Sequence, residues 1–113
     1  MDIDTQFLKG SIGLLLLNLL SRGEMYGYEI LQEASRRSAN AFEFKEGTLY
    51  PALLRLEQMG WIAAKWGVSD NNRRARFYSI TRAGKKQLAA ETQNWERISC
   101  VVARFAKPTG ESA

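Results

Sequence analysis

Residues 45–80 decide the fold of this 113-residue chain, and they read KEGTLYPALLRLEQMGWIAAKWGVSDNNRRARFYSI. Apolar residues recur at helical spacing in the first part of this stretch, at Leu49, Leu53 and Leu56. Gly60 is expected just beyond the end of that helix, because glycine accepts the left-handed backbone that commonly follows a last helical turn. The stretch therefore begins with an amphipathic helix.

A β-hairpin is expected directly after this helix. Its two strands are rich in aromatic and β-branched residues, and they cover residues 61–68 and 75–80. The polar residues 69–74 between them are turn formers. The densest positive cluster of the chain falls near the tip of this hairpin, at Arg73, Arg74 and Arg76.

Two helices are expected before this stretch. The first begins near Leu8 and stops at residues 21–23, and it should be buried because it is apolar almost all round. The second spans about residues 26–37, with an inward face formed by Tyr26, Ile30, Leu31 and Ala34. A short extended piece at residues 42–44 then leads into the third helix. Three helices followed by a hairpin form a winged helix-turn-helix, here predicted for residues 6–80, whose third helix enters the major groove of DNA.

A fourth helix is expected after the hairpin, with Thr81 as its N-cap. It carries a heptad-like apolar stripe that the preceding domain cannot fully cover, at Leu88, Trp95, Ile98, Val102 and Phe105. The same helix of a second copy is the simplest cover, because two-fold homodimers commonly bury such self-complementary stripes. Residues 81–106 are therefore predicted to be a dimerisation helix, and residues 1–5 and 107–113 to be flexible termini. The expected fold class is mainly α, of the α+β type.

Composition excludes most enzyme chemistries. Histidine is absent, which removes imidazole bases, Ser-His and Cys-His pairs and histidine metal sites. Cys100 is the only cysteine, so no intrachain disulfide or paired-thiol zinc cluster can form. Glu43 and Glu46 would be the best catalytic pair, but no nucleophile or metal partner stands beside them, and a helix N-terminus favours acidic groups anyway. We expect no enzyme activity, no metal and no cofactor.

Charge and hydropathy indicate where the protein acts. A formal net charge of +4 and a pI near 9.5 favour a polyanionic partner. The longest strongly apolar stretch, residues 12–20, is interrupted by Gly13 and Asn18 and is far shorter than the roughly 20 residues of a membrane span. No basic segment of a cleavable signal precedes it. A cytoplasmic protein without membrane contact is expected.

Candidate DNA contacts lie on the third helix and on the hairpin. Small, polar or basic residues are expected to form the face of the helix opposite its leucines, at Lys45, Thr48, Ala52 and Arg55. Tyr50 can reach a phosphate oxygen, or it can pack its ring on the core and expose only its hydroxyl. The hairpin arginines Arg73, Arg74 and Arg76 fit phosphate contact or insertion into a narrow minor groove, and the alternative is a solubilising loop. Double-stranded DNA is the predicted partner.

Trp95 has two interpretations. On a dimer stripe it would meet its symmetry mate and could stack a flat apolar ligand between two indoles. It could equally be a plain interface anchor, because aromatic residues at helical spacing usually fill interfaces. Trp61 and Trp66 are interpreted as core or hairpin packing, and Cys100 as a small apolar filler.

Three motifs, in order, resemble the PadR family of transcription regulators. They are YGYEI at residues 26–30, GTLYPALLRLEQMGWI at residues 47–62 and RRARFYSITRAG at residues 73–84, within a similarity that covers about residues 8–105. The resemblance implies a homodimeric regulator, usually a repressor, that binds a palindromic operator through paired third helices and wings. It also implies release from DNA by a small hydrophobic or aromatic effector.

The single C-terminal helix is similar to the short subfamily. Some multidrug-sensing members of that subfamily stack planar aromatic drugs on a tryptophan of this helix, and NWER at residues 94–97 resembles the segment. Trp95 is thereby implied as an effector contact, although residues 100–104 contain no acidic group that would attract a cationic drug. The alternative function is a winged-helix module for protein contacts alone, whose third helix would present an apolar or acidic outer face.

Overall fold

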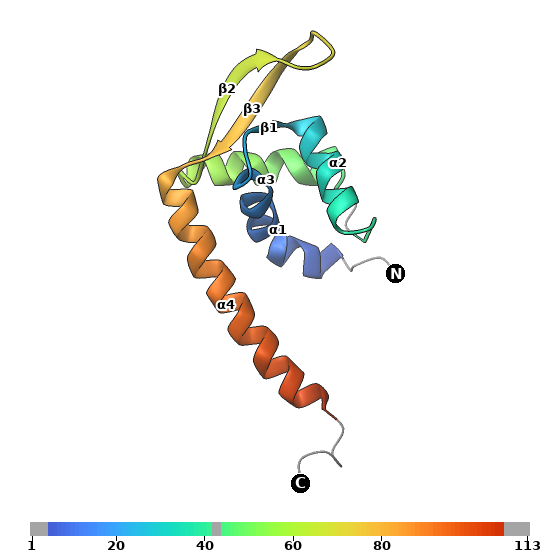
Figure 1. The fold of residues 1–113 in the computed structure, drawn as a ribbon, viewed down its shortest axis with the longest axis vertical. Coiled ribbons are helices and arrows are strands. Elements are labelled where there is room, and N and C mark those ends of the chain that lie inside the picture. Colours follow the sequence, from blue (N-terminus) through green and yellow to red (C-terminus); the bar gives the residue numbers. More distant parts are fainter. Residues whose placement is uncertain (1–4, 42–43, 108–113) are drawn as a thin grey trace.

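The computed structural model describes residues 5–41 and 44–107, with the side chains of residues 11–41 and 44–107 (Figure 1). Its elements follow in the order α1 (Thr5–Leu20), β1 (Met25–Tyr26), α2 (Gly27–Arg37), α3 (Glu46–Gln58), β2 (Ile62–Val68), β3 (Arg74–Ile80) and α4 (Arg82–Ala106). Helices α1 to α3 form a compact unit, the β2–β3 hairpin is its wing, and α4 projects away from both (Figure 1). The predicted fold, mainly α with a winged helix-turn-helix and a long last helix, is confirmed.

The core lies around α1, which contacts α2, α3, α4 and β3. Six large side chains of this core are fully buried: Leu16, Leu17, Leu20, Ile30, Leu49 and Leu53. The leucines predicted to form the inner stripe of α3 therefore do so. The first helix is buried as expected along most of its described part, but Leu14 and Leu15 stay half-exposed.

A three-stranded antiparallel sheet has the order β1-β3-β2. In the hairpin, Ile62 faces Ile80 and Trp66 faces Arg76. Strand β1 was not expected, because two residues are too few to show any period. Tyr26, predicted as the first inward residue of a helix, lies in this strand opposite Phe77, and α2 begins one residue later. Its backbone N–H donates to Glu29 Oε1 at 3.1 Å, as an N-cap group does.

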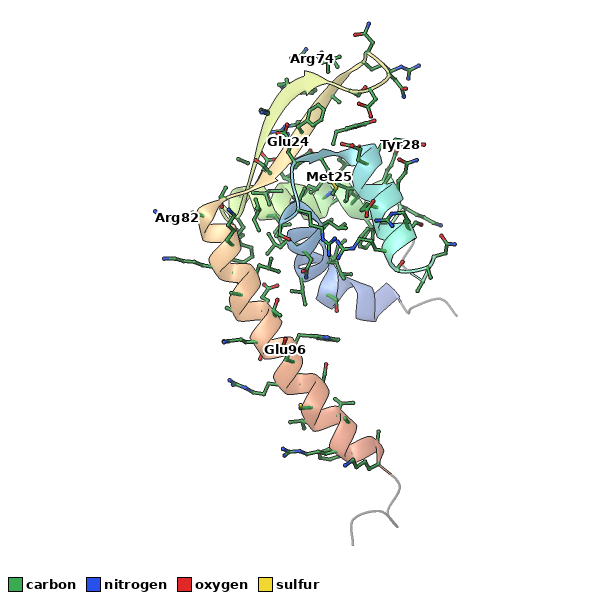
Figure 2. The ribbon with its side chains drawn as sticks, in the orientation of Figure 1. Glu24, Met25, Tyr28, Arg74, Arg82 and Glu96 are labelled. Carbon is green, nitrogen blue, oxygen red and sulfur yellow. The ribbon has the colours of Figure 1, made fainter. Side chains whose placement is uncertain are left out.

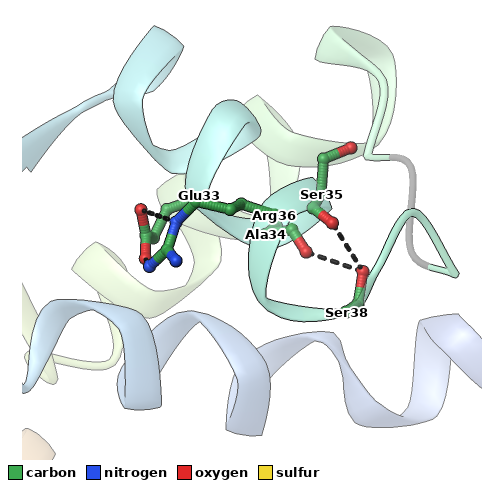
Figure 3. A network of polar contacts seen from close by, with 5 residues as sticks. All are labelled: Glu33, Ala34, Ser35, Arg36 and Ser38. Atoms are coloured by element: carbon green, nitrogen blue, oxygen red, sulfur yellow. Dashed lines mark hydrogen bonds and ion pairs between the residues drawn. The ribbon is translucent and has the colours of Figure 1, made fainter.

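Helix α2 ends in a network of short-range polar contacts (Figure 3). The Ser38 hydroxyl donates to the Ala34 carbonyl at 2.7 Å and to the Ser35 carbonyl at 3.3 Å, which satisfies carbonyls of the last turn. Arg36 forms an ion pair with Glu33, and the hydrogen bond from its guanidinium lowers the pKa of that carboxyl. The extended piece predicted next lies outside the described residues, except for Phe44, which is buried in the core.

Short turns with defined hydrogen bonds end α3 and begin α4. Gly60 follows α3 with a φ of 78°, which is the left-handed glycine predicted from the sequence. Thr81 caps α4, because its Oγ1 accepts from the Gly84 N–H at 3.0 Å. The same hydroxyl donates to the Gly60 carbonyl at 2.7 Å, and the Thr81 N–H donates to the Trp61 carbonyl at 3.0 Å. The N-cap of α4 is therefore bonded to Gly60 and Trp61, which follow α3.

The remaining predictions concern the ends of the chain and the membrane. The termini expected to be flexible fall outside the described residues, except that Thr5 opens α1 and Lys107 follows α4. Within residues 5–41 and 44–107, no helix combines the length and the hydropathy that a membrane crossing needs.

Candidate nucleic-acid interface

A groove of about 640 Å³ separates the wing from the start of α2 and the first turns of α3. We call it the wing groove. Its walls are formed by aromatic, polar and basic side chains from five elements, including Tyr26, Tyr28, Tyr50, Trp66, Arg73, Arg74, Arg76 and Tyr78. Figure 2 shows Arg74 on the wing and Tyr28 at the start of α2. The groove therefore places positive charge beside several hydroxyl groups.

The three wing arginines differ in their surroundings. Arg76 Nη2 lies 2.9 Å from Glu57 Oε2 on α3, so part of its charge is neutralised. The Arg74 guanidinium stacks 4.3 Å above the Trp66 ring, which orders the side chain without cancelling its charge. Within the described part of the chain neither Arg73 nor Arg74 takes part in an ion pair. These two are the better placed of the three to attract phosphate.

Two tyrosine hydroxyls in the groove stay neutral donors. Burial raises the pKa of Tyr78, and Arg76 only partly opposes that shift. For Tyr26, burial again raises the pKa, and the carboxylates of Asp70 and Glu29 add to the shift. Because the ordinary pKa of tyrosine is already near 10, both groups remain protonated at neutral pH; Tyr26 is half-exposed, whereas Tyr78 is buried in the core.

The structure brings only some of the predicted contacts together. Tyr50 lines the wing groove with Arg73, Arg74 and Arg76 and is 44% exposed, so its ring is not packed into the core. Thr48 and Arg55 lie on the other flank of α3, in a shallow groove that also includes Ile12 of α1. Lys45 stands at the N-cap position of α3, without a side-chain capping bond, and lines a third groove with α2.

The predicted outer face of α3 was wrong at Ala52. This residue is 7% exposed and belongs to the core, since it lies three residues after Leu49 and is therefore only about 60° away around the helix. Exposed residues define the face that points away from the core, namely Gly47, Pro51, Leu54 and Gln58. Arg55 and Tyr50 flank this small and mostly uncharged face on opposite sides.

Among the exposed aromatic residues of the groove, sequence reasoning missed two. Trp66 was expected to pack in the core or the hairpin; it does stack on a hairpin arginine, but it is 59% exposed and faces the groove. Trp61, by contrast, packs against the core as predicted. Tyr28 is also exposed, and its hydroxyl accepts from Gln32 Nε2 at 3.0 Å. The hairpin register places Trp66 opposite Arg76, and a prediction of this register would have placed Trp66 beside the wing arginines.

The predicted stripe on α4 is largely uncovered. Leu88 packs against the core, whereas exposure rises along the helix from 41% at Trp95 to 87% at Phe105. Ile98 and Val102 lie between them and are also exposed. Cys100 is exposed in the single chain, so it fills no space within the described fold. A groove of about 460 Å³ separates this part of α4 from α1 and α3, and it is lined by residues that include Arg55, Glu91 and Trp95.

Fold and groove together define a winged-helix transcriptional regulator. Residues 16–90 match the family described as "Transcriptional regulator PadR-like family". The chain belongs to this family, which confirms the resemblance found in the sequence and the expectation that the protein is a DNA-binding regulator and not an enzyme.

Several proteins are similar to this chain in sequence or in structure. An uncharacterised protein of Lysinibacillus sphaericus is 36% identical over 91% of this chain and 94% of its own length. A transcriptional regulator of Mycobacterium tuberculosis is 31% identical over 83% of this chain and 84% of its own length. The solved structure of a transcriptional regulator from Clostridium thermocellum has a TM-score of 0.83 at 32% identity, covering 91% of this chain and all of that one.

Proposed function

We propose that the protein is a homodimeric repressor that binds an inverted-repeat operator. The observation that carries this proposal is the wing groove, which joins Tyr50 of α3 to Arg73, Arg74 and Arg76 of the wing. Repression is supported by a relative, the negative transcriptional regulator PadR of Bacillus subtilis, which is 27% identical over 65% of this chain and 40% of its own length. Because the target is DNA, the protein acts in the cytoplasm.

In this proposal α3 lies in the major groove and the wing follows the backbone. The small outer face of α3 at Gly47 and Pro51 allows a close approach to base edges, and Thr48 and Arg55 reach bases or phosphates from one flank. On the other flank Tyr50 donates to a phosphate. Lys45, at the start of α3, adds a further phosphate contact.

The α4 stripe supports the homodimer. Three of its large apolar side chains, Ile98, Val102 and Phe105, are each at least 45% exposed, and a continuous stripe of this kind favours association. A second copy of α4 covers it with side chains of the same type. The two-fold symmetry of such a dimer presents two α3 helices in opposite directions, and an inverted repeat is the DNA sequence that matches this symmetry.

The groove beside Trp95 supports regulation by a small hydrophobic or aromatic effector. Its walls include Ala52, Arg55 and Leu56 of α3 as well as Trp95 of α4. A ligand stacked on the indole therefore touches the helix that enters the major groove, and it does so beside Arg55. Displacement of that side chain is a direct route from effector binding to release of DNA.

Selection of bound sequences from a random duplex pool at near-physiological salt tests the proposal. Enrichment of one inverted repeat, together with a dimer mass in light scattering, is the expected result. No enrichment by a folded protein would instead favour the alternative function, a winged-helix module that contacts only proteins. Adding planar aromatic compounds to the selected complex then tests release, with Trp95→Leu as the variant that should no longer respond.

A further inference from the structure

Gly27, the first residue of α2, has no room for a side chain. Its backbone does not need a glycine, since the glycines with a positive φ in the described part of the chain are Gly23 and Gly60. A Cβ added at Gly27 would lie 3.0 Å from Cζ and 3.2 Å from Cε1 of Tyr50, and closer still to the hydroxyl. The tyrosine tip thus occupies the position that any side chain at residue 27 would fill.

We propose that Gly27 is a positioning residue for DNA binding, because it leaves room for the Tyr50 hydroxyl at the start of α2. There the hydroxyl lies in the wing groove with Arg73 and Arg74, where it can donate to the phosphate that these arginines attract. This inference rests on the proposed function, in which Tyr50 contacts the DNA backbone. It adds a residue that itself need not touch DNA.

A methyl group at residue 27 moves the tyrosine rather than the backbone. The start of α2 is held on one side by the pairing of Tyr26 with Phe77 and on the other by Ile30, which is fully buried. Tyr50 is a partly exposed side chain, and its clashing atoms are at the far end of that side chain. A change of χ1 to another staggered rotamer swings the whole ring aside, which relieves the clash and moves the hydroxyl from its place in the groove.

Two opposite effects follow for Gly27→Ala. The unfolding midpoint stays the same or rises, because alanine is a better helix former than glycine and leaves the unfolded chain less freedom. Operator affinity falls about tenfold for each protomer, and so about a hundredfold for the dimer, since each protomer loses a hydrogen bond from an uncharged donor to a charged phosphate. If Gly27 had a purely structural role, Gly27→Ala would lower the unfolding midpoint and the operator affinity together.

The experiment is a double-mutant cycle with Gly27→Ala, Tyr50→Phe and the double variant. Thermal unfolding and mobility-shift titrations on the selected operator are measured for each. Both single variants should bind about a hundredfold more weakly as dimers, and the double variant should bind no more weakly than Tyr50→Phe, because the same hydroxyl contacts are already lost. Ser35→Ala, on the same helix but in a different groove, is the control and should bind like the wild type.

The salt dependence separates this effect from the loss of charge. Gly27→Ala should weaken binding without flattening the log-log salt slope, since a neutral hydroxyl releases no counterion, whereas loss of an arginine flattens it. Normal binding by Gly27→Ala, additive losses in the double variant, or a lower unfolding midpoint would each overturn the inference. If Tyr50→Phe and an Arg73→Ala, Arg74→Ala variant both bind normally, the wing groove itself fails as the DNA surface, and the proposed function fails with it.

Discussion

The double substitution Arg73→Ala, Arg74→Ala should remove most of the salt dependence that the wing contributes to DNA binding. Neither arginine is engaged in an ion pair within the described residues, whereas Arg76 is bonded to Glu57. In a dimer the variant loses four phosphate contacts. At about 0.9 for each contact, the slope of log affinity against log salt becomes shallower by about 3.6.

This change in slope predicts that the difference in DNA affinity between wild type and variant depends strongly on the salt concentration. Between 50 and 200 mM salt, the gap in affinity between wild type and variant should narrow by about 150-fold, which is a fourfold change in salt raised to the power of about 3.6. Mobility-shift titrations at four salt concentrations measure it. Lys65→Ala is the matched control, since this lysine lies on the same hairpin, is paired with Glu24 at 3.3 Å and does not line the wing groove.

An unchanged slope in the arginine variant would refute the reasoning. It would show that the wing does not contact phosphate and that its charge serves solubility, which was the alternative for this loop. Equal flattening by Lys65→Ala would be just as damaging, because it would mean that the net charge of the protein, rather than the position of Arg73 and Arg74, controls binding.

Three further substitutions test the dimer, the core and the joint between α3 and α4. Phe105→Glu should convert the dimer to monomers in light scattering, because it puts a charge into the most exposed part of the apolar stripe. Leu53→Ala should lower the free energy of unfolding by about 2–5 kcal/mol in urea titrations, since this side chain is fully buried. Thr81→Ala should lower the free energy of unfolding by about 1–2 kcal/mol, because the helix cap and the bond to Gly60 are both lost. An unchanged urea midpoint would show that the cap contributes nothing to stability.

Much of the fold could be predicted from the sequence because its signals are local and periodic. The leucines of α3, the glycine after it and the threonine that caps α4 each express a rule that operates within one or two turns of helix. Strand β1 could not be found this way. Its pairing with β3 depends on residues about 50 positions apart, and two residues carry no pattern.

The site was harder to predict because it depends on how the elements are placed relative to one another. Side-chain chemistry alone predicted Tyr50 and the three wing arginines as candidate DNA contacts, and the structure brings these four residues together in one groove. The spacing used for the outer face of α3 selected Ala52, which lies beside the core leucines and not opposite them. Trp66 turns toward the groove because of the hairpin register, and Gly27 has no room for a side chain because Tyr50 of α3 reaches the start of α2.

The packing at Gly84 affects how the two α3 helices would be spaced in the proposed dimer. A Cβ at Gly84 would lie 2.9 Å from the carbonyl carbon of Trp61 and 2.8 Å from Ile80 Cγ1, so the first turn of α4 sits against the residues that follow α3 with no room between them. Since Thr81 also bonds to Gly60, the start of α4 is held against the residues that follow α3 by close packing and by a hydrogen bond. In the proposed dimer, the angle at which the two α4 helices cross therefore fixes the distance between the two α3 helices. The packing of α4 against its partner then determines the number of base pairs between operator half-sites, although α4 itself lies away from the residues proposed to contact bases.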